Sequence, residues 1–255
     1  MIKREPYPIL EFDECQVAII NPSEVEKRHG RLPNDKLVIT FFKDAIQLLI
    51  REGKIEEDRT IVGENDLVLY RFTDDGTYLM HGMIGCPACA GYLDELIGMG
   101  ISKVLFCGGG GVLDASIRVG ELLVVEGAIR DEGFSYHYVK PSRILYAQEE
   151  VRKTIGSYLS EKHIPYAEGL TWTTDAFYRE TKDRVLLRKE EGAKIVEMEQ
   201  SGCIAVAQFR KIKYGAILYA GDDVSQEVWD PRSWRDRKGI RYALIEICKD
   251  LVRRI

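Results

Sequence analysis

Carboxylate side chains follow two apolar segments of the sequence, at points where strands are expected to end. Glu197 and Glu199 flank Met198 at the end of one apolar run, and Asp222 follows the apolar segment Tyr214–Tyr219. A buried carboxylate accepts hydrogen bonds from two donors at once, which suits the vicinal diol of a sugar. An Asp acts as a general acid where its site raises its pKa. The alternative is that these acids favour a helix N-terminus or make an Asp turn.

Four consecutive glycines, Gly108 to Gly111, directly follow the apolar segment Lys103–Cys107. Glycine costs roughly 1 kcal/mol against alanine in regular structure, so the run indicates a place where the backbone approaches something closely. Consecutive free N–H groups at a strand end could hold an anion or a sugar oxygen. A flexible turn is the alternative. A dinucleotide-binding fold is disfavoured, because no GxGxxG leads into a helix.

Aromatic and hydroxyl side chains gather in the segment Thr171–Tyr178, which follows a predicted strand. Phe177 or Trp172 could stack on a flat ligand, or could pack in the core. Among the six cysteines, Cys86 and Cys89 form a CxxC. No second CxxC or paired His motif completes a zinc site, so we expect free thiols on a packed helix face and no metal.

Composition and charge exclude several classes of function. The chain has 255 residues, 36 Lys plus Arg and 41 Asp plus Glu, and the resulting net charge of -5 argues against a nucleic-acid partner. No apolar run approaches the roughly 20 residues of a membrane helix. Residues Met1 to Asp13 lack the apolar stretch of a signal peptide. We therefore expect a cytoplasmic protein without a membrane partner.

Short apolar runs alternate with helical periodicity, which predicts an α/β fold in one domain spanning residues 1–255. Asp74-Asp75-Gly76 predicts a tight hairpin turn. The predicted strands are Gln16–Ile20, Leu37–Thr40, Leu67–Phe72, Tyr78–His81, Lys103–Cys107, Glu121–Glu126, Ala167–Leu170, Ile195–Glu197 and Tyr214–Tyr219. The predicted helices are Phe41–Glu52, Pro87–Met99, Gln148–Glu161, Gln200–Phe209 and Ile240–Arg253.

Taken together and in order, these segments resemble the nucleoside phosphorylase superfamily, which includes uridine and purine nucleoside phosphorylases. Met83–Pro87 is similar to the family's Gly-Ile-Gly-x-Pro helix start, and Val119–Val124 resembles its Val-Gly-Asp-[Ile/Val]-Val-Val strand. Residues 128–138 are close to a stretch common in the uridine phosphorylase-like branch. Thr174–Tyr178 matches the segment whose Phe contacts the base. Val196–Glu199 matches the Glu-Met-Glu signature, the most specific of the set.

The resemblance implies a three-layer α/β sandwich around a mixed, partly closed central sheet. It also implies a homo-oligomer, usually a trimer of dimers, in which a neighbouring subunit completes each site. Members of the family cleave the N-glycosidic bond of a nucleoside, their small-molecule partner. Phosphorylases use orthophosphate as co-substrate and yield ribose 1-phosphate and free base, whereas hydrolases use water. The chemistry needs no metal and no organic cofactor.

The resemblance also implies roles for individual residues. Glu199 would hold the ribose hydroxyls, with Met198 against the sugar and Glu197 nearby. Phe177 would pack on the base. Asp222 takes the place of the Asp that protonates the leaving base in purine-cleaving members, which favours a purine. Uridine phosphorylases bind uracil with a Gln and an Arg shortly after the Phe. Residues 179–184 contain no Gln, but they contain Arg179 and Arg184, so the identity of the base stays open.

The phosphate site departs from the family pattern. In phosphorylases a loop after the first strand reads Gly-Asp-Pro-x-Arg, and we match it to residues 21–27, where Glu24 stands at the Arg position. Phe106 stands where the family has an Arg before its glycine loop, and Gly109 where it has Ser or Thr. Two strong Arg contacts to phosphate are thereby lost, and a carboxylate there would repel the anion.

Three alternatives follow for the acceptor. Phosphate could bind through the amides of Gly108 to Gly111, above all Gly108 and Gly109, together with basic residues such as Arg143 or a neighbour's Lys43. Glu24 or Glu26 could instead orient an attacking water in a hydrolase. The chain could also bind a nucleoside without cleaving it. We expect a nucleoside phosphorylase, with hydrolysis as the principal alternative.

Two further features have no assigned role. His137 lies in an aromatic segment and could face the ligand. The basic segment 229–241, which contains Trp229 and Trp234, could be a solvated helix start. Alternatively it could be a lid over the base, since the family places a mobile loop before its last helix.

Overall fold

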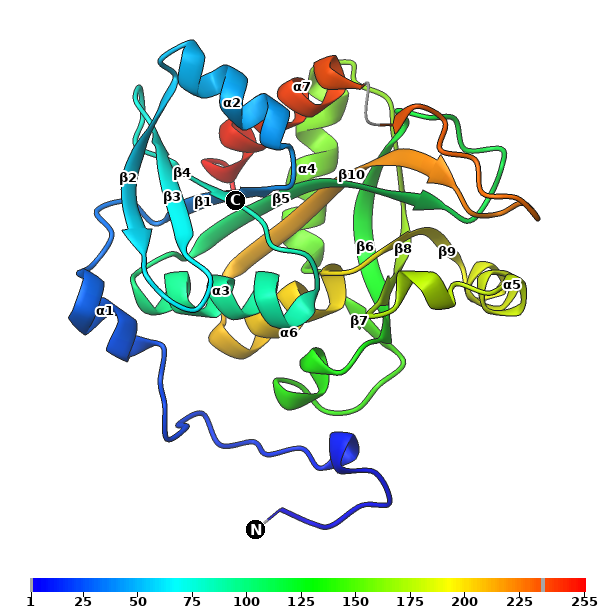
Figure 1. Ribbon diagram of the computed structural model, residues 1–255, viewed down its shortest axis with the longest axis horizontal. Helices are drawn as coiled ribbons and strands as arrows, with labels where there is room; N and C mark the ends of the chain where they lie inside the picture. The colour runs from blue at the N-terminus through cyan, green and yellow to red at the C-terminus, as the bar shows by residue number, and fades with distance from the viewer. Residues whose placement is uncertain (1, 235–236) are drawn as a thin grey trace.

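The computed structural model describes residues 2–234 and 237–255, in which ten strands form one mixed sheet (Figure 1). The strands are β1 (Lys36–Thr40), β2 (Ile55–Ile61), β3 (Leu67–Phe72), β4 (Tyr78–His81), β5 (Lys103–Val112), β6 (Leu122–Asp131), β7 (Ile144–Tyr146), β8 (Tyr166–Thr174), β9 (Ala193–Glu197) and β10 (Lys213–Asp223). Their order is β10-β6-β8-β9-β5-β1-β4-β3-β2, with β7 paired to β6.

An additional pairing between β10 and β5 closes part of this sheet. Strands β5, β10, β6, β8 and β9 therefore form a ring, and β1, β4, β3 and β2 extend from β5 as an open arm. The ring mixes parallel pairs with antiparallel ones, such as β5 with β9 and β6 with β10. The predicted α/β fold with a mixed, partly closed sheet is confirmed.

Helices cover both faces of the sheet and bury two apolar cores. Helices α3 (Cys86–Gly98) and α6 (Gln200–Arg210) pack on one face, and α2 (Lys43–Arg51), α4 (Glu149–Glu161) and α7 (Lys238–Val252) pack on the other (Figure 1). Along β1, Leu37 and Ile39 face the first core and Val38 faces the second, as the alternation of a strand requires. The remaining helices are α1 (Ser23–His29), α5 (Lys182–Glu190) and the 3-10 turns Pro8–Leu10, Phe134–His137 and Phe177–Arg179.

The glycine run is part of β5 and does not form the loop that we expected. Gly108 and Gly109 pair with Leu218 and Tyr219 of β10, so their backbone groups belong to the sheet ladder. A Cβ on Gly109 would lie 2.8 Å from the Tyr219 ring, and one on Gly110 would lie 2.4 Å from the carbonyl oxygen of Val196. The glycines thus allow the close strand approach that closes the ring.

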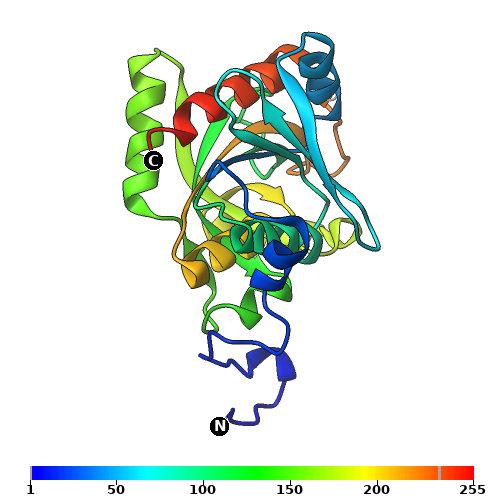
Figure 2. The same cartoon turned by 90° about the vertical axis from the view of Figure 1, so that its left-hand side faces the viewer.

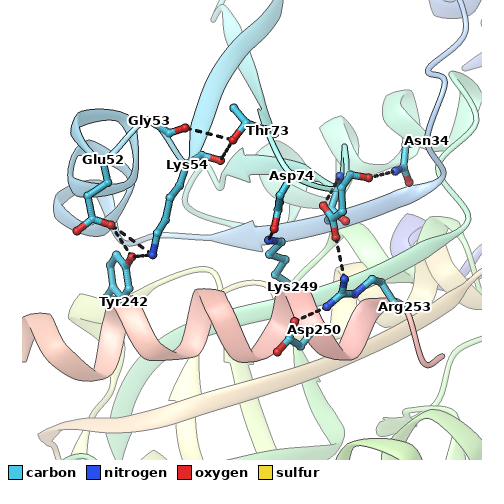
Figure 3. A network of polar contacts seen from close by, with 12 residues as sticks. Asn34, Glu52, Gly53, Lys54, Thr73, Asp74, Tyr242, Lys249, Asp250 and Arg253 are labelled. Carbon is cyan, nitrogen blue, oxygen red and sulfur yellow. Dashed lines mark hydrogen bonds and ion pairs between the residues drawn. The ribbon is translucent and has the colours of Figure 1, made fainter.

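The predicted hairpin joins β3 to β4, with Gly76 at a φ of +73°. Helix α7 holds this hairpin by ion pairs from Lys249 to Asp74 and from Arg253 to Asp75, the latter at 3.4 Å (Figure 3). Further along α7, the Tyr242 hydroxyl donates to Glu52 at the end of α2, at 2.6 Å. These contacts fix α7 against the open arm of the sheet.

Other predicted elements differ from the structure. Gln16–Ile20 is not a strand, since it pairs with no other segment and Val17, Ile19 and Ile20 are 73–104% exposed. It lies in an N-terminal segment that extends away from the sheet and its helices (Figures 1 and 2). The edge strand β2 escaped prediction because its central residues are charged, a common feature of edges. Helix α5 was not predicted either, because most of its residues are charged.

No helix in the described part of the chain combines the length and the apolar character needed to cross a membrane.

We predict that Gly110→Ala lowers the free energy of unfolding by about 1–3 kcal/mol, because the new methyl group has no space between β5 and β9. The matched control is Gly91→Ala in α3, where an added Cβ meets nothing within 4 Å. This control should be neutral or stabilising by up to about 1 kcal/mol. Urea unfolding followed by circular dichroism measures both. Equal stability of the two variants would contradict this role of the glycine run.

Candidate active site

A cavity of about 1140 Å³ opens where several strands of the sheet end. Its walls include His81 from β4, Gly108 and Gly109 from β5, Glu197 from β9 and Asp222 from β10. Ligand crevices in α/β sheets form at such strand ends. The closure of the ring therefore gathers residues that lie far apart in the sequence around one volume.

Seven of the predicted site residues line this cavity: Gly108, Gly109, Phe177, Glu197, Met198, Glu199 and Asp222. Glu24 and Glu26 do not line it. They lie on α1, where Glu24 forms an ion pair with Lys27 at 2.5 Å and Glu26 with Arg31 at 3.7 Å. Within the described chain, neither acid is therefore placed to orient a water in this cavity.

Our sequence prediction placed the first strand of the sheet at Gln16–Ile20, which is too early in the chain, and therefore matched the family's loop to the wrong residues. The first strand of the sheet is β1, so the loop that follows it begins at Phe41 and not at Asn21. Phe41 and Phe42 line the cavity there, and the Phe41 ring lies 5.5 Å from that of Phe106. An apolar wall thus stands where the family pattern has arginine.

The Glu197 carboxyl group accepts four hydrogen bonds from neighbouring parts of the chain, so its role is structural. Its Oε1 accepts the hydroxyls of Thr171 at 2.9 Å and Thr173 at 2.5 Å. Its Oε2 accepts the backbone N–H groups of Glu199 at 2.6 Å and Gln200 at 2.7 Å, which are orphan donors at the start of α6. Burial raises the pKa of Glu197, and the donated hydrogen bonds oppose that rise.

Glu199 is the carboxyl group that this arrangement presents to the cavity. It is 7% exposed, and its Oε1 accepts the backbone N–H of Gly85 at 2.8 Å. Burial, followed by the nearby Glu197, raises the pKa of Glu199 to about 8. A group of this kind is a candidate for direct contact with a ligand.

Asp222 faces the cavity beside the aromatic residues. The Trp229 indole N–H donates to its Oδ2 at 2.7 Å. A Cβ on Gly111 would lie 3.6 Å from its Oδ1. Phe177 lines the same cavity and is 50% exposed, which leaves its ring available to a flat ligand.

Glu180 is a cavity residue that the sequence analysis did not identify. It is half-buried, and burial together with the charge of Asp222 raises its pKa to about 7. Its position three residues after Phe177 was the available signal. The charged stretch from Arg179 to Arg184 gives no periodicity that would tell which side chain faces inward.

The cavity is strongly acidic. Five carboxyl groups line it, namely Glu180, Glu197, Glu199, Asp222 and Glu227. Among the described lining residues, the cationic side chains are Lys182 and Arg241, and both are paired. Lys182 contacts Glu227 at 2.6 Å, and Arg241 contacts Asp44 at 3.1 Å. Burial lowers the pKa of His81, which disfavours a charged imidazole.

The two unassigned features lie in different places. His137 lines a separate cavity of about 450 Å³, bordered by the N-terminal segment and Arg210 of α6. Trp229, Trp234 and Arg241 line the main cavity, so part of the segment 229–241 forms its wall. Arg235 lies outside the described residues.

No group of three or more His, Cys, Asp or Glu side chains that could hold a metal occurs in residues 2–234 and 237–255. Cys86 and Cys89 are buried free thiols in α3. A Cβ on Gly202 of α6 would lie 2.7 Å from Cys86 Sγ, so these small side chains permit close packing of α3 and α6.

Comparisons with known proteins show which proteins this chain resembles. The chain is 27% identical over 164 residues to a guanosine phosphorylase from Halorubrum lacusprofundi, an alignment covering 63% of this chain and 68% of that protein. Alignments with further curated relatives cover 34% to 63% of those proteins.

Two solved structures share the fold. One is an AMP nucleosidase from Bacteroides thetaiotaomicron, with a TM-score of 0.71 and 22% identity, covering 92% of this chain and 97% of that one. The other is a purine nucleoside phosphorylase from Toxoplasma gondii in complex with immucillin-H, with a TM-score of 0.70 and 19% identity, covering 87% and 93%. The model of the phosphorylase superfamily matches residues 36–252, and the chain therefore belongs to the phosphorylase superfamily.

Proposed function

We propose that this protein cleaves the N-glycosidic bond of a purine nucleoside and transfers the pentosyl group to orthophosphate. One observation carries the proposal: a single cavity brings together the buried Glu199 carboxyl, Met198, the open face of Phe177 and Asp222. These are a diol acceptor, an apolar wall for the sugar, a stacking ring for the base and an acidic group near it. The similarity to the guanosine phosphorylase named above supports the choice of a purine.

The chemistry follows from the charge that develops as the bond breaks. The sugar becomes oxocarbenium-like and positive, and a surrounding excess of carboxyl groups stabilises positive charge. Glu199 in its ionised form accepts hydrogen bonds from the two ribose hydroxyls. The leaving base gains electron density and departs more easily when an acid protonates it. Phe177 holds the base plane at the mouth of the cavity.

Water is a second candidate acceptor, and the charge of the cavity favours it. Both described cationic side chains of the lining already contact carboxylates, and Phe41 and Phe106 border the acceptor end. A phosphate dianion gains little from such surroundings, whereas a neutral water is not repelled by them.

Base release measured by chromatography tests the proposal. Adenosine, inosine, guanosine, uridine and methylthioadenosine would each be incubated with the protein, with and without millimolar phosphate. We expect purine release that depends on phosphate and yields ribose 1-phosphate. Equal release without phosphate would identify a hydrolase. Absence of release from every nucleoside would contradict the proposed cleavage and favour a binding protein.

The raised pKa of Glu199 predicts a variant that is more stable and inactive. The folded pKa of about 8 lies above the ordinary 4.5, so the folded state holds this proton more tightly and loses stability as the pH rises through this window. Glu199→Gln keeps the shape without the charge. The difference in unfolding free energy between Glu199→Gln and the wild type should therefore grow in favour of the variant by about 1 kcal/mol for each pH unit between pH 5 and 8. The rate of nucleoside cleavage should fall at least about 100-fold.

Glu197→Gln is the matched control within the same motif. The amide cannot accept at both positions that receive donors, so this variant should be destabilised by about 1–3 kcal/mol. Thermal unfolding by calorimetry at several pH values separates the two. A stability difference between Glu199→Gln and wild type that stays constant with pH would contradict the assignment of a buried, protonated Glu199.

A further inference from the structure

Glu180 and Asp222 face the same cavity from different parts of the chain. Glu180 ends the 3-10 turn that carries Phe177, and Asp222 lies near the end of β10. The charge of Asp222 acts on Glu180, so the two carboxyl groups are electrostatically coupled. Glu180 thus follows directly on the turn of Phe177, and Asp222 acts on it across the same cavity.

The surroundings of the two acids differ. Asp222 Oδ2 accepts a hydrogen bond from the Trp229 indole, a group that can only donate, so this oxygen is fixed as an acceptor. No described residue donates a hydrogen bond to the Glu180 carboxyl, which is partly buried. Asp222 Oδ2 is therefore already engaged as an acceptor, whereas burial favours the neutral form of Glu180.

The other charged groups around the cavity do not reverse this balance. Lys182 is engaged by Glu227 and Arg241 by Asp44. Glu197 and Glu199 add further carboxyl groups from β9 and the start of α6, and burial disfavours charge on His81. Glu180 thus faces the negative charge of Asp222 without a free cation among the described lining residues, and the pKa of about 7 leaves it half-protonated near neutral pH.

We propose that Glu180 gives the proton to the leaving base, and that Asp222 is a positioning residue whose negative charge keeps that proton on Glu180. This inference rests on the proposed cleavage of a purine nucleoside. The family resemblance assigned protonation of the leaving base to Asp222 alone, whereas this inference divides that role between Glu180 and Asp222.

The step balances as follows. The bond between C1′ and the base nitrogen breaks, and its electron pair remains with the base. The O–H bond of Glu180 breaks, its proton goes to a ring nitrogen of the purine, and Glu180 becomes a carboxylate. An oxygen of orthophosphate or water forms the new bond to C1′. The hydrogen that this acceptor loses returns through solvent to Glu180.

The experiment compares guanosine with 7-methylguanosine, whose base already carries the positive charge that protonation would create. In Glu180→Gln we expect the rate on guanosine to fall by about 10²–10⁴-fold, with the rate on 7-methylguanosine within a few-fold of wild type. Asp183→Asn is the matched control, because Asp183 is an exposed acid outside the cavity lining. A parallel loss on both substrates would overturn the proposal.

The pH profile of Asp222→Asn provides an independent test. In the wild type, kcat/KM on guanosine should fall above about pH 7 as Glu180 loses its proton. Removing the Asp222 charge should move this fall to lower pH, and activity should recover at acid pH. Activity that is lost at every pH would mean that Asp222 is itself the acid. If the wild type cleaves neither substrate, the proposed function fails instead.

Discussion

The site depends on the hydrogen bonds that the Glu197 carboxylate accepts. It accepts hydroxyls from two threonines of β8 and the first N–H groups of α6, so it joins a strand, its neighbour and a helix at one point. Ser201 in turn donates its N–H to Thr173, which extends the same network into the helix. A fully bonded acid in this place fixes the start of α6. The fixed start places Glu199 at the helix cap, where its carboxyl faces the cavity.

Closure of the sheet sets the shape of that cavity. The paired glycines of β5 let β9 and β10 approach, and Glu199 and Asp222 come to line one volume near the ends of these strands. Concentrating carboxyl groups in this way costs stability, because each lies near others in a poorly solvated space. In the proposed cleavage, negative charge on these groups stabilises a positive sugar in the transition state. The acidic lining is therefore better explained by catalysis than by folding.

Local patterns predicted much of this arrangement. The Glu-Met-Glu signature, Phe177 and Asp222 lie at strand ends that short apolar runs reveal, and all line the cavity. The glycine run was misassigned to a loop because its strand character depends on β9 and β10, which are distant in the sequence. The apolar residues Val17 to Ile20 suggested a strand, but no partner pairs with them. Arg241 and Phe41 reach the site only through the tertiary fold.

Proton linkage to ligand binding tests the central claim, that Glu199 receives the ribose hydroxyls as a carboxylate. Formycin B is an inosine analogue whose carbon–carbon glycosidic bond resists cleavage. Its binding would be measured by calorimetry at pH 7 in buffers of different ionisation enthalpy, for wild type and Glu199→Gln. Because free Glu199 has a pKa of about 8, binding to wild type should release a proton that the variant does not release, and should be tighter. Equal proton release and equal affinity in the two proteins would contradict the account.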